Sequence, residues 1–284
     1  MNATGRSILV TGASTGIGAA CALRFDGQGY RVFAGVRNEA DADSLRSRAS
    51  NRLVPVLLDV TDLESVAFAA TQIDECLDGG GLFGLVNNAG ITVNAPMEFV
   101  PIDILRRQIE VNFIGQVAVT QAILPMLRRV RGRIVNMGSI AGRVSLIFGG
   151  PYSASKFALE AFTDALRMEL SPWGMHVAIV EPGPIATRIW DKGMRQAETL
   201  IDSMPPQARE FYGHLIPKMM ATVKKTAESA VAPEVVVAKV EHALTSKRPR
   251  TRYLVGPNTG MHLMLSRLPD RWKDIVVHMY LNRQ

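Results

Sequence analysis

The chain has 284 residues, of which 47% are hydrophobic and 20% charged, so it can bury a full core as one doubly wound α/β domain. Its two cysteines, Cys21 and Cys76, fall in helix-like patterns, which argues against a disulfide framework and favours a reducing compartment. The five histidines lack metal-ligand spacing, so we predict no metal site.

The formal net charge of +6 is concentrated near the C-terminus, where residues 246–273 contain seven basic residues and one acid, Asp270. A solvated surface is the simplest interpretation, a weak peripheral membrane contact is an alternative, and nucleic-acid binding is not expected. The first β-rich run begins at Ser7, and no apolar run reaches about 18 residues. We therefore expect no signal peptide, no membrane span and a cytoplasmic location.

The first strand is predicted over residues 7–11, and it runs directly into the glycine-rich segment Gly12 to Gly18, which opens a helix lasting to about Gly27. Glycines let the backbone turn sharply and approach a pyrophosphate, which binds the free N–H groups of a helix N-terminus. The position of the motif between strand and helix favours a dinucleotide site over a plain tight turn.

The second strand, residues 31–36, ends at Arg37 without an acidic residue. In dinucleotide-binding folds an acid here binds the ribose 2′-hydroxyl, whereas an Arg suits a 2′-phosphate. Arg37 therefore favours NADP(H) over NAD(H), although Thr15 adds no second basic group from the glycine turn.

A third buried strand over residues 53–58 ends in Asp59. The following Thr61 to Glu64 has the form of a capping box, which would start a helix running to about Leu77 and leave Asp59 free to accept from an adenine amino group. Three glycines, residues 79–81, close that helix.

The fourth strand, residues 82–86, runs into Asn87 to Gly90, at the sheet edge where ligands bind in open α/β folds. A long helix is predicted from about 102 to 129, with Asn112 among apolar residues. Asn112 has two interpretations: a satisfied internal polar contact, or a carbonyl that bends the helix and holds a water.

The fifth strand, residues 133–137, ends beside Ser139, and a loop then leads to a helix that begins near Tyr152. Tyr152 and Lys156 are four residues apart and so share a helix face. A nearby ammonium lowers the phenol pKa from its ordinary value of about 10, which would allow Tyr152 to give and take a proton. Alone, however, this spacing also fits an ordinary helix turn.

Residues 175–180 form a predicted sixth strand, and strand-helix alternation over six strands indicates a parallel, doubly wound sheet. Residues 188–230 are helical in pattern and rich in Met and aromatics, as suits a lid over an apolar ligand, although we expect at least half of these side chains to pack within the lid. A helix from Ala232 and a seventh strand over residues 252–255 complete a single Rossmann-type domain, 1–284, whose residues 231–284 form the C-terminal helix, last strand and tail.

Residues 7 to about 190 resemble the short-chain dehydrogenase/reductase family. The match rests on the glycine motif from Thr11 to Gly18, Asn87 to Gly90, Asn112, Ser139, the Tyr152 to Lys156 motif and Pro182-Gly183, all in order. The C-terminal segment resembles the steroid- and retinol-dehydrogenase branch. The resemblance implies that Tyr152 is the acid/base, that Lys156 lowers its pKa and binds the nicotinamide ribose, that Ser139 binds the substrate oxygen and that Asn112 completes a tetrad.

The same resemblance implies a set of cofactor-binding residues besides Tyr152 and Lys156. They are Gly12, Ser14, Thr15, Gly16, Ile17 and Gly18 around the phosphates, Arg37 at the adenosine ribose, Asp59 and Val60 at the adenine, Asn87, Ala89 and Gly90 near the second ribose, and Pro182, Gly183, Ile185 and Thr187 at the carboxamide. Thr15 departs from the basic residue found there in many NADP(H)-dependent members.

These observations predict an NADP(H)-preferring oxidoreductase that interconverts an alcohol and a carbonyl on an apolar steroid-, retinoid- or lipid-like substrate. One alternative keeps the same residues with NAD(H) and a small polar ketone, and another is a dinucleotide-binding regulator without turnover. The family resemblance also implies a homodimer or homotetramer formed through the helices at about 102–129 and 152–171. The basic run beside Met261 and Met264 prompts the membrane-surface alternative for residues 246–281.

Overall fold

The computed structural model describes residues 5–187 and 189–282. Seven parallel strands form one sheet in the order β3-β2-β1-β4-β5-β6-β7. They are β1 (Ser7–Val10), β2 (Arg31–Val36), β3 (Leu53–Leu57), β4 (Leu82–Asn87), β5 (Arg133–Met137), β6 (His176–Pro182) and β7 (Arg252–Val255). The predicted seven-stranded parallel sheet is confirmed, and β6 continues two residues beyond the predicted end.

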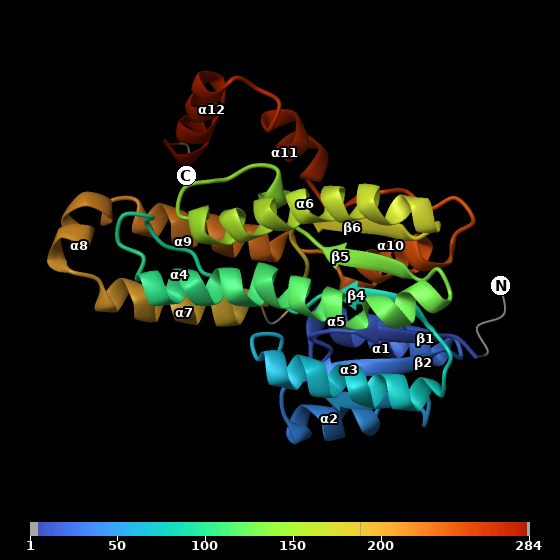
Figure 1. The fold of residues 1–284 in the computed structure, drawn as a ribbon. Coiled ribbons are helices and arrows are strands. Elements are labelled where there is room, and N and C mark those ends of the chain that lie inside the picture. Colours follow the sequence, from blue (N-terminus) through green and yellow to red (C-terminus); the bar gives the residue numbers. More distant parts are fainter. Residues whose placement is uncertain (1–4, 188, 283–284) are drawn as a thin grey trace.

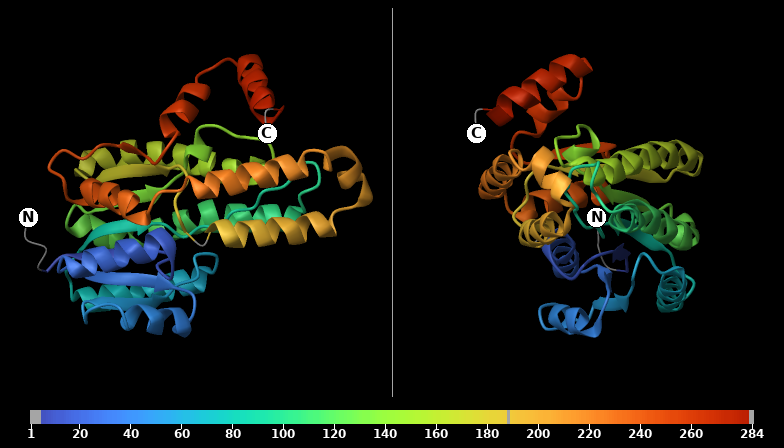
Figure 2. Two further views of the ribbon diagram at one scale, coloured as in Figure 1. Left: turned by 180° about the vertical axis from the view of Figure 1, so that it is seen from behind. Right: turned by 90° about the vertical axis from the view of Figure 1, so that its left-hand side faces the viewer.

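Helices cover both faces of the sheet (Figures 1 and 2). On one face α1 (Gly16–Gly27), α2 (Glu39–Arg46) and α10 (Pro233–Thr245) pack on an apolar cluster that includes Ile8, Val86 and Val135. On the other face α3 (Leu63–Leu77), α5 (Gly115–Arg129) and α6 (Gly150–Leu170) pack on a second cluster that includes Leu9, Leu85 and Ile134. Both sides of each central strand are therefore buried, which explains their unbroken apolar runs.

The start of α3 differs from the predicted capping box. Asp62, not Thr61, is the N-cap, and its carboxylate accepts from the backbone N–H of Glu64 at 3.0 Å. The Thr61 hydroxyl instead donates to Asp59 Oδ1 at 2.7 Å, and the Thr61 N–H donates to the same oxygen at 2.9 Å. The capping prediction was therefore wrong by one residue, and one oxygen of Asp59 is already occupied.

The predicted single helix over residues 102–129 is interrupted. It consists of α4 (Ile102–Ile109), a π-helical turn η1 (Glu110–Ile114) and α5. Asn112 lies at the centre of this turn, is fully buried, and bonds to the loop after β4 and to α6. These tertiary bonds explain why a turn with one extra residue is stable here.

The segment that follows β6 is helical, as predicted. It contains α7 (Ile189–Ser203), α8 (Pro206–Tyr212) and α9 (Ile216–Glu228), which extend beyond the sheet alongside α4 (Figures 1 and 2). Leu200, Met204 and Ala208 are buried against Val93 and Val100 of the loop after β4. This small separate core fixes the extension to that loop.

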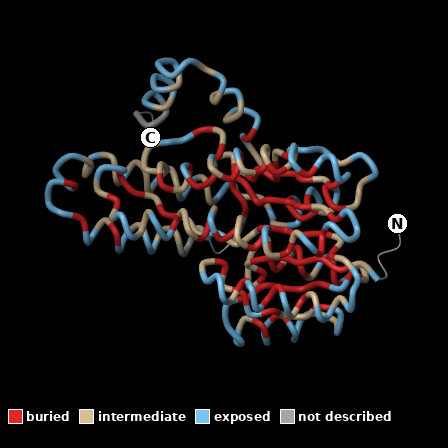
Figure 3. The backbone as a smooth tube through the Cα atoms, viewed as in Figure 1, coloured by how far each residue is buried: buried red, intermediate tan, exposed pale blue. Residues whose placement is uncertain are grey.

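The C-terminal helices α11 (Thr259–Leu265) and α12 (Asp270–Asn282) project away from the body of the protein. Figure 3 shows α12 to be largely exposed, whereas the residues of α11 range from buried Thr259 to exposed Met261 and Met264. Among the described residues no helix is both long and apolar enough to cross a membrane.

Candidate active site

The candidate site lies where the strand order reverses between β1 and β4, at the carboxyl ends of the parallel strands. β1 pairs with β2 on one side and with β4 on the other, so the chain crosses over in opposite directions from this point. Loops after neighbouring strands diverge here and leave a crevice, which is the usual ligand site of doubly wound sheets. The glycine turn, Arg37, Asp59, Ser139 and Pro182-Gly183 lie at or just after strand ends, whereas Asn112, Tyr152 and Lys156 lie on helices.

The glycine turn after β1 has the backbone geometry that only glycine adopts readily. Gly12 and Gly16 have φ angles of +62° and +59°. A Cβ at Gly18 would lie 2.2 Å from the carbonyl oxygen of Gly12, so α1 meets the turn too closely for any side chain. Thr15 is the N-cap of α1 without a side-chain cap bond. The first N–H groups of α1 therefore face a cradle of backbone, which fits a pyrophosphate.

Asn88 holds this turn to β4, a role that sequence reasoning missed. Its Nδ2 donates to the carbonyls of Thr11 and Gly12 at 3.0 and 3.1 Å, while the Thr11 hydroxyl accepts from the N–H groups of Asn88 and Ala89. The sequence signal for this role is the pair of Asn residues at the end of β4. The sequence analysis assigned a role only to the first of them, Asn87.

Asn87 makes hydrogen bonds inside the protein. Its side chain is fully buried, and Nδ2 donates to Thr120 Oγ1 at 2.8 Å and to Asn136 Oδ1 at 2.9 Å. The side-chain Nδ2 of Asn87 thus joins β4 to β5 and α5, while Oδ1 is buried without a hydrogen-bond partner among the described residues. Gly90 does border the site, since a Cβ there would lie 3.4 Å from Asn112 Oδ1.

The far wall of the crevice is formed by the segment after β6. A Cβ at Gly16 would lie 3.2 Å from the side chain of Thr187, so this segment reaches across to the glycine turn. Ile185 is buried, and its carbonyl accepts from the indole N–H of Trp190 at 2.7 Å. Gly183 is bound to β7 through its N–H, which donates to the Val255 carbonyl at 2.7 Å.

The residues expected at the adenosine end also lie together. Arg37 is exposed immediately after β2, and its positive charge acts on Asp59 after β3. Burial opposes ionisation of Asp59, but hydrogen bonds from Thr61 and the charges of Arg37 and Arg107 outweigh it and hold the carboxyl pKa below its ordinary value. Arg107, on α4, is a second basic group here that the sequence did not single out. Val60 is buried against Gly115.

Ser139, Tyr152 and Lys156 come together at the ends of β5 and α6. Lys156 Nζ lies 5.7 Å from the centroid of the Tyr152 ring and donates to the Met137 carbonyl at 2.8 Å. Ser139 follows Met137 by two residues and is the N-cap of the short helix η2 (Ile140–Gly142). Its hydroxyl lies 3.4 Å from the Pro182 carbonyl. One site thus contains a phenol, a hydroxyl and an amine, which are groups that can take part in proton transfer.

The predicted lowering of the Tyr152 pKa is wrong for the polypeptide itself. Burial raises the phenol pKa above its ordinary value, and hydrogen bonding with Ser139 opposes this only in part. Burial also lowers the pKa of the Lys156 amine, to about 8. Tyr152 is therefore a protonated phenol at neutral pH, the form required of a proton donor.

Asn112 connects this site to the loop after β4. Its Nδ2 donates to the Ile91 carbonyl at 2.9 Å and to Ser155 Oγ at 3.0 Å, and its Oδ1 accepts from the Ile91 N–H at 2.8 Å. Ser155 in turn donates to the Tyr152 carbonyl at 2.7 Å. The internal polar contact predicted for Asn112 is confirmed, and Ser155 is a positioning residue that the sequence did not reveal.

Apolar side chains border the open side of the site. Tyr212 of α8 contacts Phe148 and Phe99 edge to face, with ring centroids 5.8 and 5.9 Å apart. Phe148 precedes the Tyr152 helix and has φ +62°, an uncommon conformation for a bulky residue, while its carbonyl accepts from the Ala95 N–H at 2.9 Å. Of the ten lid residues singled out, Leu200 and Met204 are buried, Ile189 and Phe211 are exposed, and the other six are intermediate.

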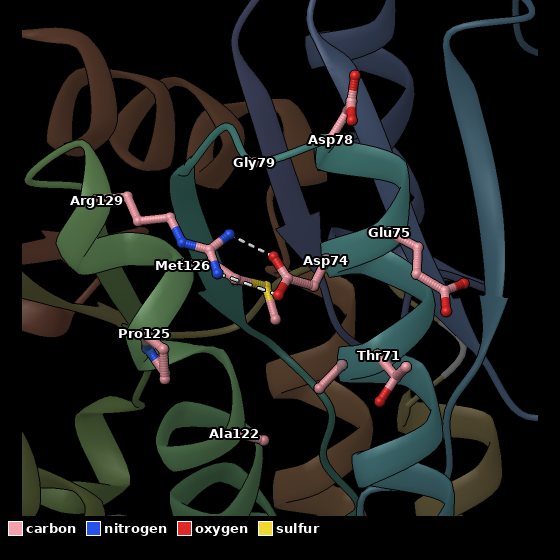
Figure 4. A pocket seen from close by; sticks show the side chains of 10 residues that line it. Thr71, Asp74, Glu75, Asp78, Gly79, Ala122, Pro125, Met126 and Arg129 are labelled. Carbon is pink, nitrogen blue, oxygen red and sulfur yellow. Dashed lines mark hydrogen bonds and ion pairs between the residues drawn. The ribbon is translucent and has the colours of Figure 1, made fainter.

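A separate cavity of about 540 Å³ lies between α3 and α5 (Figure 4). It is lined by the ends of these helices, where Arg129 pairs with Asp74 and donates to the Gly80 carbonyl at 3.1 Å. Gly80 lies two residues before β4, so this cavity is at the opposite edge of the sheet from the candidate site. Within the described ranges, no group of three or more His, Cys, Asp or Glu side chains could hold a metal ion.

Comparison with known proteins agrees with this geometry. Residues 6–198 match the family model for short chain dehydrogenases. The chain is 40% identical to human retinol dehydrogenase 16 over 280 residues, covering 95% of this chain and 87% of that protein. It is 38% identical to Bos taurus 17-beta-hydroxysteroid dehydrogenase type 6 over 276 residues, with the same coverage.

Two solved structures share the fold along almost the whole chain. A short-chain dehydrogenase from Streptomyces avermitilis has a TM-score of 0.77 and 26% identity, covering 99% of this chain and 96% of that one. A short chain dehydrogenase from Burkholderia cenocepacia in complex with NADP has a TM-score of 0.73 and 28% identity, covering 99% of both chains. This chain therefore belongs to the short chain dehydrogenase family, as an NAD(P)-dependent dehydrogenase or reductase related to retinol and hydroxysteroid dehydrogenases.

Proposed function

We propose that the protein interconverts an alcohol and its carbonyl on an apolar, retinoid- or steroid-like substrate, with NADP(H) preferred. The observation that carries the proposal is the placement of Ser139, Tyr152 and Lys156 beside a glycine cradle shaped for a pyrophosphate. The likeness to retinol dehydrogenase 16 and 17-beta-hydroxysteroid dehydrogenase type 6 supports the substrate class. The direct test is oxidation of NADPH or NADH by the purified protein with retinal, steroid ketones and small polar ketones. Turnover of NADPH with the bulky ketones is expected.

In the proposed mechanism, the glycine turn after β1 would hold a dinucleotide, which would supply or accept the hydride. The polypeptide supplies the proton and the geometry. Tyr152, a phenol at neutral pH, donates its proton to the carbonyl oxygen, and the Ser139 hydroxyl donates a hydrogen bond to the same oxygen. The Lys156 cation then stabilises the phenolate that remains. The bonds from Asn112 to Ser155 and Ile91 hold α6 and the neighbouring loop at a fixed distance, which serves orientation.

Half-buried Trp190, Met194, Leu215 and Met219 of the lid support an apolar substrate, because they retain apolar surface that the lid does not bury in its own core. Phe148 and Tyr212 add aromatic surface next to the Tyr152 helix. A small polar ketone would leave most of this surface unused.

The preference for NADP(H) rests on Arg37, whose side chain is exposed beside Asp59. We expect Arg37→Ala to raise the KM for NADPH by about tenfold to 100-fold, because a charge-assisted bond to the 2′-phosphate is lost. The KM for NADH should change little. Steady-state kinetics with both nucleotides measure the effect. Arg52→Ala is the control, because Arg52 is exposed and directly precedes β3, at the opposite end of that strand from Asp59. Equal increases in KM for NADPH and NADH would show that Arg37 does not bind the 2′-phosphate.

A peripheral membrane contact through the C-terminal helices is part of the proposal. Trp272, Ile275, Val276 and Met279 of α12 recur at helical spacing and are exposed at 64%, 51%, 39% and 51%. This stripe overlaps the end of the basic run of residues 246–273, so apolar and basic groups are presented together, as on helices that lie in a lipid interface.

We expect the protein to co-sediment with vesicles rich in anionic phospholipid at low salt, and Trp272→Glu combined with Ile275→Glu to abolish that binding. Neutral phosphatidylcholine vesicles and a Phe68→Glu variant, which changes an exposed apolar residue on α3, are the controls. Wild-type protein that stays in solution with anionic vesicles would end the proposal for α12. An oligomer through the α4–α5 and α6 helices is a further expectation, supported by exposed Ile114, Phe157 and Met168.

A further inference from the structure

A cluster of charged side chains lies directly behind the candidate catalytic residues, and the proposed mechanism does not use it. Glu160 and Glu181 are only 6% and 2% exposed. Arg252 Nη1 donates to both carboxylates, at 2.9 Å to Glu181 Oε1, and its Nη2 donates to Asp164 Oδ2 at 2.7 Å. Arg143 lies 3.8 Å from an oxygen of each glutamate. We call these five residues the Arg252 cluster.

The cluster is attached to the segments that carry the site. Glu160 follows Lys156 by one turn of α6, and so lies on the same helix face. Arg143 follows Ser139 by four residues, at the end of η2. Glu181 directly precedes Pro182 on β6. Displacement of the cluster would therefore move the amine and the hydroxyl of the site relative to each other.

The contact between η2 and α6 leaves no space for adjustment. A Cβ at Gly142 would lie 2.9 Å from the Lys156 carbonyl oxygen and 3.1 Å from Glu160 Cγ. The turn that carries Ser139 thus packs closely against α6 at Lys156 and Glu160. Glu160 Oε1 is buried and has no hydrogen-bond partner among the described residues. Its charge is therefore only partly compensated and acts on its surroundings.

Glu160 and Lys156 influence each other's ionisation. Burial lowers the pKa of Lys156 to about 8, and the charge of Glu160 acts in the opposite direction. Burial and Glu181 raise the pKa of Glu160 to about 7, while Arg252 opposes them. Ionised Glu160 therefore favours the Lys156 cation, and Lys156 loses this support where Glu160 is protonated.

We propose that Glu160 is a positioning residue that keeps Lys156 cationic and in place beside Tyr152, and that Arg252 keeps Glu160 ionised and oriented. The inference rests on the proposed function, because it concerns the amine of that same site. The pH range of activity then depends on Glu160, which is buried one helical turn after Lys156.

Other charged groups face the cluster from each neighbouring element. They are Asp164 and Arg167 on α6, Arg143 after η2, Glu181 on β6, and Lys239, His242 and Arg267, which line an adjacent pocket of about 560 Å³ together with Arg143, Arg250 and Arg252. Lys239, His242, Arg250 and Arg267 are exposed and so are screened by solvent. Glu160 is the buried acid whose charge raises the pKa of Lys156.

The test compares Glu160→Gln with wild type. Removal of the negative charge lowers the pKa of Lys156, so the alkaline limb of the pH profile of kcat should move to lower pH by roughly one unit. The ¹³Cε resonance of Lys156, assigned by its absence in Lys156→Arg, should titrate with the same shift in the protein alone. This second measurement requires no turnover. If the wild type is active and Glu160→Gln shows neither shift, the role of Glu160 is overturned. If the Lys156 resonance shifts but the wild type shows no turnover, the proposed function is overturned instead.

Asp164→Asn is the matched control, because it removes another carboxylate bound to Arg252 without acting directly on Lys156. It should lower the unfolding midpoint but leave the Lys156 titration in place. Equal shifts in both variants would show general loosening and contradict the proposal. Glu160→Asp, which draws the carboxylate back by one methylene, should give a smaller shift in the same direction and serves if Glu160→Gln does not fold. A Glu160→Asp protein whose Lys156 titrates as in wild type would then overturn the claim.

Discussion

Tyr152→Phe is expected to lower kcat for carbonyl reduction by about 10³-fold to 10⁴-fold, because the substitution removes the proton donor and retains the ring. The fold should persist, since neither Ser155 Oγ, which donates to the Tyr152 backbone carbonyl, nor Lys156 Nζ, which donates to Met137, needs the phenol oxygen. NADPH binding, followed by quenching of protein fluorescence, should remain close to wild type. Rate and binding together separate loss of chemistry from loss of structure.

Tyr30→Phe is the matched control. Tyr30 is a buried tyrosine that packs against Phe25 and Phe83 behind the sheet, away from the candidate site. Its variant should turn over at the wild-type rate. Retention of full activity by Tyr152→Phe would remove the general acid from the proposed mechanism and favour the alternative of a dinucleotide-binding regulator.

Gly18→Ala is expected to weaken nucleotide binding by about tenfold to 100-fold, the cost of forcing a methyl group into a filled space. Its Cβ would lie 2.2 Å from the Gly12 carbonyl oxygen and 2.5 Å from Asn88 Nδ2, so either the glycine turn or the helix must move. Both atoms belong to the hydrogen bond that joins the turn to β4. Titration calorimetry with NADPH measures the loss.

Gly27→Ala provides the comparison on the same helix. No atom lies within 4 Å of a Cβ at Gly27, so the affinity should be unchanged. Wild-type affinity in Gly18→Ala would show that the cradle does not hold the nucleotide. An equal loss in both variants would attribute the effect to α1 as a whole.

Much of the fold could be predicted because local sequence and tertiary structure agree. The apolar runs of the central strands are buried on both faces, so their limits were visible within two residues. The start of α3 was predicted one residue too early, because Thr61 and Asp62 are neighbouring residues that both favour the N-cap. Asp59 accepts both bonds from Thr61, and this contact decides between them.

The grouping of Ser139, Tyr152 and Lys156 was predictable, but the electrostatics of the candidate site were not. The order of motifs identified Ser139, Tyr152 and Lys156, which the structure brings together. The pKa of Tyr152 depends on how deeply the phenol and the amine are buried, and a four-residue spacing does not contain that information. Likewise, the direction of the Asn87 side chain depends on Thr120 and Asn136, which are distant in sequence.

The π-helical turn around Asn112 has a consequence for the phase of the helix that it interrupts. One additional residue rotates all that follows by about 100° about the helix axis. Gln108, before the turn, accepts from the Val93 N–H, and Gln116, after it, donates to the Ala89 carbonyl. A single rod thereby presents amides to two separate stretches of one loop while the apolar face of α5 still meets the sheet. A regular α-helix of the same length could align only one of those sets of contacts.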